Sequence, residues 1–228
     1  MKITRIVVLL AVFLGLTNLS RAQEAKTDSL APAKLAIGLN LSTYGPGLEL
    51  IKGLNDQFTL RLGIRYLPVH LKINQEVSGM QMNLDNNLKM NTLSLISDYH
   101  FAKYVHLSGG VFINLTKIET TISSLTGKTF GVIEITPEAM GTITASLKPS
   151  VIAPYLGIGF GRNLPFAKKV AFNFELGAVY QGGMKAEMHG TGMIAPTASS
   201  EQSDILTSNL SPYKFYPFMM FQLSYRIN

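Results

Sequence analysis

The chain has 228 residues and a formal net charge of +6 at pH 7, from 20 basic and 14 acidic side chains. Only 15% of the residues are charged and 46% are apolar, whereas a water-soluble domain usually has about a quarter of its residues charged. The chain has no cysteine, which excludes disulfide bonds and a lipid-modified amino-terminal cysteine. The composition therefore argues against an ordinary water-soluble domain.

The first residues are typical of a secretory signal peptide. Lys2 and Arg5 lead into an apolar run at residues 6–16, and Ser20 and Ala22 are the small residues expected before a cleavage site. A helix made of that run would be roughly 16 Å long, too short for a hydrocarbon layer of roughly 30 Å. We therefore expect cleavage after Ala22 rather than a membrane anchor.

The predicted domain boundaries follow from this cleavage site. Residues 1–22 form the signal peptide, residues 23–33 a polar, disordered leader, and residues 34–228 one β-barrel domain. Removal of the signal leaves seventeen basic and fourteen acidic residues, a net charge of +3. A positive charge this small does not favour nucleic-acid binding. No later stretch is long and apolar enough for a membrane-spanning helix.

Alternation of apolar and polar residues with a period of two recurs along the rest of the chain. We predict eight strands, at residues 35–42, 48–50, 58–68, 93–101, 105–114, 152–160, 170–181 and 215–227. Three connections are short, at 54–57, 102–104 and 163–169. Three others are long and polar, near 77–87, 125–148 and 187–211. Short turns on one side and long loops on the other are typical of outer-membrane barrels, with both termini on the periplasmic side.

A lipocalin-like soluble barrel would show the same alternation, so the composition of the two stripes has to decide which one faces outward. The polar stripe is mostly Gly, Ser, Asn and Ala, which suits a narrow interior, and aromatic residues recur near strand ends as a membrane girdle requires. We therefore predict an all-β fold, an eight-stranded antiparallel up-and-down transmembrane β-barrel with its apolar stripe toward lipid. Pro154 and Pro217 lie inside predicted strands, where we expect bulges or irregular pairing.

Ionisable residues on the polar stripe would meet inside the barrel. They are Glu49, Arg61, Arg65, Asp98, His100, Glu175 and Arg226, together with the amide of Asn114. Such a cluster is either a selectivity filter for a small solute or a salt-bridged plug, and the plug is favoured because isolated charges cannot stay unpaired there. Arg61 and Arg65 are about 14 Å apart along the strand, so we expect that they need separate carboxylates.

Other chemistry finds less support. Asp98, His100 and His106 offer three metal ligands without a fourth, so we predict no metal site and no cofactor. A lipid-modifying acylhydrolase or acyltransferase would need His70 or His189, and neither adjoins a nucleophile motif, so we predict no enzyme. An adhesin or scaffold acting through the 187–211 loop stays open.

Several segments resemble a known family. They are Ala153 to Gly161, Phe174 to Gly182, Tyr216 to Arg226, Ser97 to His100 and Thr43 to Gly47. These stretches are similar to the carbapenem-associated outer-membrane proteins of the CarO type, and the likeness spans most of residues 35–228. The resemblance implies an eight-stranded outer-membrane barrel, and the uptake of small basic amino acids linked to that type.

The last strand also resembles the carboxy-terminal signal read by the outer-membrane barrel assembly machinery, with Phe221, Leu223, Tyr225 and Ile227 at alternate places. Departures are Ile in place of a terminal Phe and the extra residue Asn228. We predict a monomer located in the cell outer membrane, in contact with outer-membrane lipid and lipopolysaccharide. It would be structural or a narrow porin-like path for small polar solutes.

Overall fold

A computed structural model describes residues 35–77, 80–130, 133–165 and 169–227, so the predicted signal peptide and leader lie outside the described residues. The strands are β1 (Leu35–Ser42), β2 (Gly45–Gly53), β3 (Phe58–Val77), β4 (Met80–Ala102), β5 (Val105–Asn114), β6 (Lys117–Ser124), β7 (Lys128–Phe130), β8 (Ile133–Ile135), β9 (Thr142–Lys148), β10 (Ile152–Gly161), β11 (Val170–Tyr180), β12 (Lys185–Gly190) and β13 (Phe215–Arg226). The prediction of an all-β chain is confirmed.

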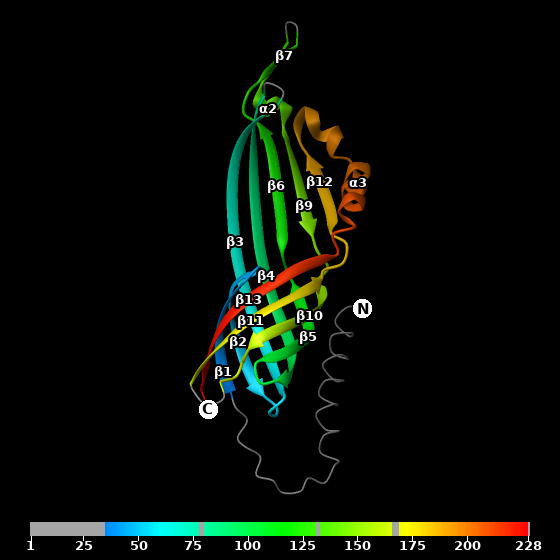
Figure 1. The fold of residues 1–228 in the computed structure, drawn as a ribbon. Helices are drawn as coiled ribbons and strands as arrows, with labels where there is room; N and C mark the ends of the chain where they lie inside the picture. Colours follow the sequence, from blue (N-terminus) through cyan, green and yellow to red (C-terminus); the bar gives the residue numbers. More distant parts are fainter. Residues whose placement is uncertain (1–34, 78–79, 131–132, 166–168, 228) are drawn as a thin grey trace. The chain divides into compact units, whose positions relative to one another are not determined.

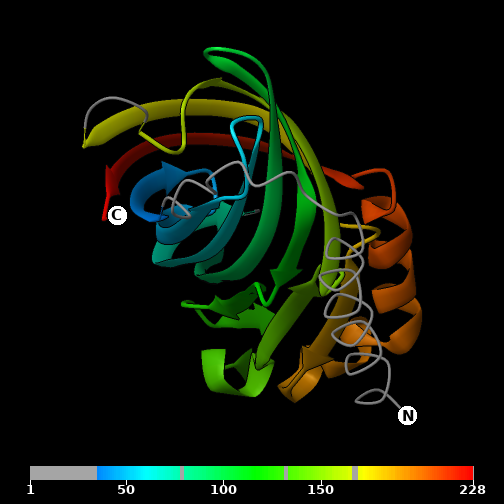
Figure 2. The same ribbon diagram turned by 90° about the horizontal axis from the view of Figure 1, so that it is seen from below.

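Eight of these strands form a ring, seen along its length in Figure 2. Pairing runs from β4 through β3, β2, β1, β13, β11 and β10 to β5, and β5 pairs with β4 again. Every neighbouring pair in the ring is antiparallel. The predicted count of eight antiparallel strands is therefore confirmed for the ring.

Five strands continue the sheet beyond one end of the ring (Figure 1). β3 and β4 run on unbroken, whereas β6, β9 and β12 extend the ladders of β5, β10 and β11 after breaks at 115–116, 149–151 and 181–184. We call this part of the sheet the extension. The end of the ring from which it continues is the loop side, and the opposite end, with the turns at 54–57 and 103–104, is the turn side. The loop predicted near 77–87 is wrong, because β3 and β4 pair as far as Val77 and Met80.

Helices accompany the extension. α2 (Pro137–Met140) starts at the N-cap Thr136, whose side chain accepts a hydrogen bond from the Ala139 N–H, and Gly141 at φ 86° follows it. A 3-10 helix, η1 (Gly192–Ala198), leads into α3 (Ser200–Leu210). β12, η1 and α3 together occupy most of the segment 187–211, so the prediction of a loop there is wrong.

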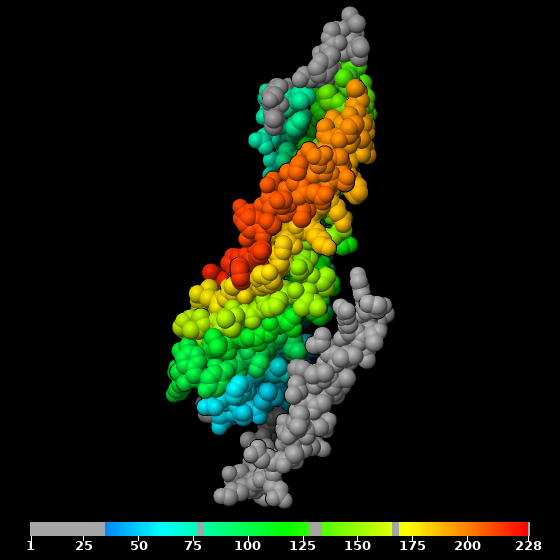
Figure 3. All heavy atoms as spheres, turned by 90° about the vertical axis from the view of Figure 1, so that its right-hand side faces the viewer, coloured from blue at the N-terminus to red at the C-terminus, as the bar shows by residue number. Residues whose placement is uncertain are grey.

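α3 covers the outer edge of the extension (Figures 1 and 3). Ser203 and Thr207, one turn apart, accept hydrogen bonds of 3.0 Å from the backbone N–H groups of Met188 and Ala186 in β12. These N–H groups belong to the side of β12 that pairs with no strand among the described residues. The helix thereby satisfies an edge that would otherwise be open to another strand.

The apolar stripe of each ring strand faces outward. The side chains of Phe172, Leu176, Phe221 and Leu223 are 74%, 38%, 58% and 41% exposed, whereas the alternate positions are buried inside the ring. The nine aromatic residues near strand ends are also exposed, namely Phe58, Tyr66, Tyr99, Phe101, Tyr104, Phe172, Tyr180, Phe215 and Tyr225. The structure thus has the orientation of stripes that the polarity of the sequence predicts.

The extension reverses this polarity on the same strands. Beyond Tyr66 the outward positions of β3 are Pro68, His70, Lys72, Asn74 and Glu76, and those of β4 are similarly polar. The inner face of the extension is apolar instead, with Leu67, Val69, Leu71, Ile73, Leu84, Leu88, Ile118, Ile122, Ile143 and Leu147 on it. The outward face therefore changes from apolar to polar where the extension leaves the ring.

Neither strand proline produces the irregular pairing that we expected. Pro154 lies one residue beyond the β10–β11 ladder, which begins at Tyr155, and Pro217 lies beyond the end of the β1–β13 ladder. Each proline therefore has its missing N–H on a side where no ladder continues. The register shift of the ring lies elsewhere, between His100 and Ala102.

No helix in the described part of the chain is long and apolar enough to cross a membrane.

Candidate functional site

A cluster of buried charges fills the turn-side half of the ring, and Arg61 of β3 is its centre. Nη1 donates to Glu49 at 3.2 Å, while Nη2 donates to Asp98 at 2.8 Å and to both oxygens of Glu175 at 2.7 and 3.0 Å. The Nε–H donates to Asp98 as well, at 3.2 Å. One guanidinium thus joins carboxylates from β2, β4 and β11, and its side chain is fully buried.

Arg65 shares Glu49 with Arg61, so the expectation of separate carboxylates is wrong. Nη2 of Arg65 donates to Oε1 of Glu49, and Nη1 of Arg61 donates to Oε2. Glu49 stands opposite Gly63 in the β2–β3 ladder, midway between the two arginines. Long arginine side chains close the distance from both sides, which a spacing between Cα atoms does not reveal.

Gly63 makes room for that shared carboxylate. A Cβ atom at this position would lie 2.7 Å from Oγ of Ser94 and 3.0 Å from Cγ of Glu49. Contacts that short require the neighbouring side chains to move. The glycine in the polar stripe is therefore part of the cluster's geometry.

Hydroxyl and amide groups complete the coordination of the carboxylates. Asp98 accepts hydrogen bonds from Thr59 at 2.8 Å, Ser108 at 2.9 Å and Asn163 at 2.7 Å. Glu175 accepts one from the phenol of Tyr155 at 2.5 Å. Buried charges persist when they are paired and hydrogen-bonded, as the three carboxylates around Arg61 are.

The remaining predicted residues lie around this cluster. The rings of His100 and His106 lie 4.8 Å apart, and His106 is 3.7 Å from Glu175. Asn114 is buried in the last position of β5, at the loop-side end of that strand. Arg226 is half-buried at the last position of β13 on the turn side, outside the group of residues bonded to Arg61.

Three of the buried groups have the arrangement of metal ligands. Ligand atoms of Asp98, His106 and Glu175 lie within 4.8 Å of one another. The Nη2 group of Arg61 stands between the two carboxylates, at 2.8 and 2.7 Å. A guanidinium there takes the place that a cation would need, so the group does not fit a metal ion in this conformation.

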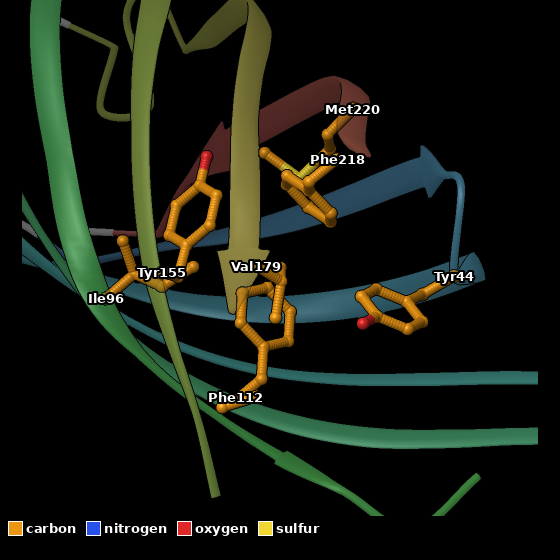
Figure 4. Close-up of a cluster of buried hydrophobic side chains, with 8 residues drawn as sticks. Tyr44, Ile96, Phe112, Tyr155, Val179, Phe218 and Met220 are labelled. Carbon is orange, nitrogen blue, oxygen red and sulfur yellow. The ribbon is translucent and has the colours of Figure 1, made fainter. Parts of the chain in front are cut away.

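Aromatic and other apolar side chains lie together inside the ring (Figure 4). The cluster consists of Tyr44, Ile96, Phe112, Ala153, Tyr155, Val179, Phe218 and Met220. Arg65 links the two layers, because its guanidinium lies 5.4 Å from the ring centre of Phe112 and 5.3 Å from that of Phe218. We expected small and hydrogen-bonding side chains here, and this apolar layer was not predicted.

Several of these residues could have been found from the sequence. Phe112, Tyr155 and Phe218 occupy inward positions of strands whose alternation is regular, so continuing the period of two places them inside. Asn163 gives no such signal, since it follows β10 in an irregular connection. The sequence thus predicts the charged residues that meet around Arg61, whereas it did not lead us to the apolar cluster beside them.

The last strand and the two loop-side histidines complete the predicted residues. Phe221, Leu223, Tyr225 and Ile227 are all exposed on the outward face at the end of the chain. His70 lies 2.5 Å from Asp85 on the outward face of the extension, where Lys72 also pairs with that carboxylate. His189 lies on β12, opposite Thr144.

Comparison with known proteins identifies the fold. No family model and no curated protein sequence matches the chain. The crystal structure of CarO2 from Acinetobacter baumannii is similar with a TM-score of 0.56 and 18% identity, over 86% of this chain and 100% of that one. CarO from the same organism gives 0.54 and 18%, over 84% and 97%. Ail, the attachment invasion locus protein of Yersinia pestis, gives 0.38 and 12%, over 86% and 97%. The similarity to the two CarO structures shows a CarO-like fold, as the resemblance of the chain's segments predicts.

Proposed function

We propose that the chain is an outer-membrane β-barrel protein, in which the ring crosses the membrane and the extension stands above it. The observation that carries this proposal is the change of polarity on the outward face of β3. That face bears Leu62, Ile64 and Tyr66 in the ring and His70 and Lys72 in the extension. One unbroken strand that passes from an apolar to a polar outward face fits a passage from lipid to water.

The height of the apolar band supports the same placement. On β13 the outward side chains from Phe215 to Tyr225 are all exposed and none is charged. The ten residue steps from Phe215 to Tyr225 cover about 34 Å of strand, and at a tilt of about 40° they span roughly 26 Å. This agrees with the apolar band of about 25 Å in outer-membrane barrels. The CarO-like fold supports this placement as well.

Within this placement the ring acts as an anchor rather than an open pore. Arg61 and Arg65 are fully buried, and the aromatic layer of Phe112 and Phe218 covers them on the loop side. A solute would have to separate ion pairs without water to replace them, which costs several kcal/mol per charge. The proposed role is therefore structural, with the extension as the surface offered to the outside. We propose no enzymatic activity for it.

Membrane fractionation combined with surface proteolysis tests the proposal. The protein should sediment with outer membranes, and protease added to intact cells should cut within residues 187–211 while the ring survives. Export through the predicted signal peptide and insertion by the barrel assembly machinery belong to the same proposal. Recovery in the soluble fraction, or cleavage of 187–211 in lysed cells but not in intact cells, would reject it.

A narrow path for small polar solutes is the second candidate, because part of the interior has amides without protein partners. Neither polar atom of the Asn40 or Gln222 side chain has a hydrogen-bond partner among the described residues, although both side chains are buried. Buried polar atoms of this kind are usually hydrated. Single-channel recording in planar bilayers separates the two roles: discrete conductance steps favour the path, and their absence favours the anchor.

A further inference from the structure

Four lysines lie in one row across the outward face of the extension. Lys89 of β4 is directly opposite Lys117 of β6, and Lys148 of β9 is directly opposite Lys185 of β12. The β6–β9 ladder pairs Ile118 with Leu147, so Lys117 and Lys148 take the next opposite places in it. Opposite residues of antiparallel strands point to the same face, so all four ammonium groups share one side.

That side is the outward one. Lys89 is four residues from Leu93 on the same strand, and Leu93 belongs to the exposed apolar stripe of the ring. Positions an even number of residues apart on a strand share a face. All four lysines are exposed.

The row lies directly above the apolar band. Exposed Leu115 precedes Lys117 by two residues, and exposed Ile152 follows Lys148 by four. Rising from the ring, each strand therefore changes from lipid-facing side chains to lysine within a few residues. In the proposed membrane placement this level is the headgroup layer of the outer leaflet.

The fold leaves much of this charge unbalanced. Like charges directly opposite each other destabilise a sheet. Among residues that the structure describes, Lys148 is the one lysine of the four with an ion pair, which it forms with Glu187 at 2.7 Å. Glu119, two residues from Lys117 on β6, is the second acidic residue next to the row on the same face. Four ammonium groups thus stand against two carboxylates. An anionic partner outside the chain would remove the repulsion.

We propose that this row, Lys89, Lys117, Lys148 and Lys185, binds the phosphate groups of outer-leaflet lipopolysaccharide. The inference rests on the proposed membrane placement and assigns the contact to particular side chains. Lipid A presents phosphates at the level where acyl chains end, which is where the row lies. Each lysine near an anionic membrane surface strengthens binding about fivefold, so the row favours a lipid carrying several phosphates.

Titration of the folded mature protein in zwitterionic micelles with phosphorylated lipid A tests the assignment. The test variant is the triple substitution Lys89→Gln, Lys117→Gln and Lys185→Gln, which retains the ion-paired lysine. We expect it to bind on the order of 100 times more weakly than wild type, at about fivefold per lysine. Dephosphorylated lipid A should bind wild type as weakly as phosphorylated lipid A binds the variant.

The matched control removes the same charge at the turn side, with Lys52→Gln, Lys103→Gln and Lys169→Gln. These lysines are exposed and lie at the turn side: Lys52 is near the end of β2, Lys103 is in the turn after β4, and Lys169 precedes β11. We expect less than a twofold change in the control, and wild-type heat-modifiable migration for both variants because all six sites are on the surface.

Three results would overturn the assignment: equal binding by wild type and the row variant, an equal loss in the control, or full displacement of lipid A by millimolar inorganic phosphate. The last would assign the row to a free anion. Failure here differs from failure of the membrane placement, which fractionation decides separately.

Discussion

Replacement of Arg61 by methionine would remove the centre of the buried cluster while keeping much of its volume. The substitution breaks the hydrogen bonds to Glu49, Asp98 and Glu175 together. It leaves the hydrogen bond from Arg65 to Glu49 in place. Because the side chains of all three acids are fully buried, the carboxylates would stay desolvated and repel one another.

The expected cost follows from these contacts. Breaking one buried pair by removing a partner costs about 3–5 kcal/mol, and Arg61 has three such partners that share one guanidinium. Effects within one network are not additive, so we expect about 5 kcal/mol rather than a multiple of it. Adding Glu175→Gln removes one of the stranded charges and should restore at least about 1 kcal/mol.

Urea unfolding of the refolded protein in detergent micelles measures this change, with far-UV circular dichroism and heat-modifiable migration as probes. Lys52→Met, at an exposed position, is the control and should change the unfolding free energy by less than about 0.5 kcal/mol. A loss below about 1 kcal/mol for Arg61→Met would refute the reasoning, because it would mean that water reaches the cluster. So would a double variant less stable than the single one.

Three further changes have defined outcomes. Gly63→Ala should destabilise the ring by about 1–3 kcal/mol in the same urea titration. Gly109→Ala is the control and should be near neutral, since a Cβ atom there meets nothing within 4 Å. Equal effects of the two substitutions would contradict the packing argument. Ser203→Ala should speed amide hydrogen exchange at the edge of β12 by up to about tenfold without changing ring stability, and unchanged exchange would dismiss the helix as an edge cover. Lys148 holds the pKa of the Glu187 carboxyl below its ordinary value of 4.5 through a hydrogen bond, so the ion pair is complete above that value and is lost as pH falls through the lowered pKa. Lys148→Met should raise this pKa toward its ordinary value, as carbon-13 NMR would show, and an unmoved pKa would exclude that cause.

Much of the ring could be predicted because the face that a strand residue takes depends on its place in the local sequence pattern. A period of two in side-chain polarity fixes which face of a strand each residue takes, and the ring strands keep that period, from β1 at the start to β13 at the end. Once the apolar stripe is placed outward, Glu49, Arg61 and Glu175 must turn inward. Their meeting around one guanidinium follows from the narrowness of the interior.

The extension was missed because its polarity is reversed. Residues 77–87 contain Asn, Asp and Gln at alternate places, which is typical of loops as well as of a strand with a polar outward face. α3 did carry a signal, since Ser199 caps it by accepting a hydrogen bond from the Gln202 N–H, in the spacing of a capping box. The sharing of Glu49 by two arginines depends on side-chain reach and lies beyond what spacing reveals.

Site-directed spin labelling along the outward face of β3 tests the central claim most directly, because the chain has no cysteine and each label site is unique. Single cysteines at Leu62, Ile64, His70 and Lys72 would carry a nitroxide in protein reconstituted into lipid vesicles. The account predicts that the two ring sites are relaxed by oxygen and the two extension sites by a water-soluble paramagnetic complex. Equal access of the water-soluble complex to all four sites would contradict it.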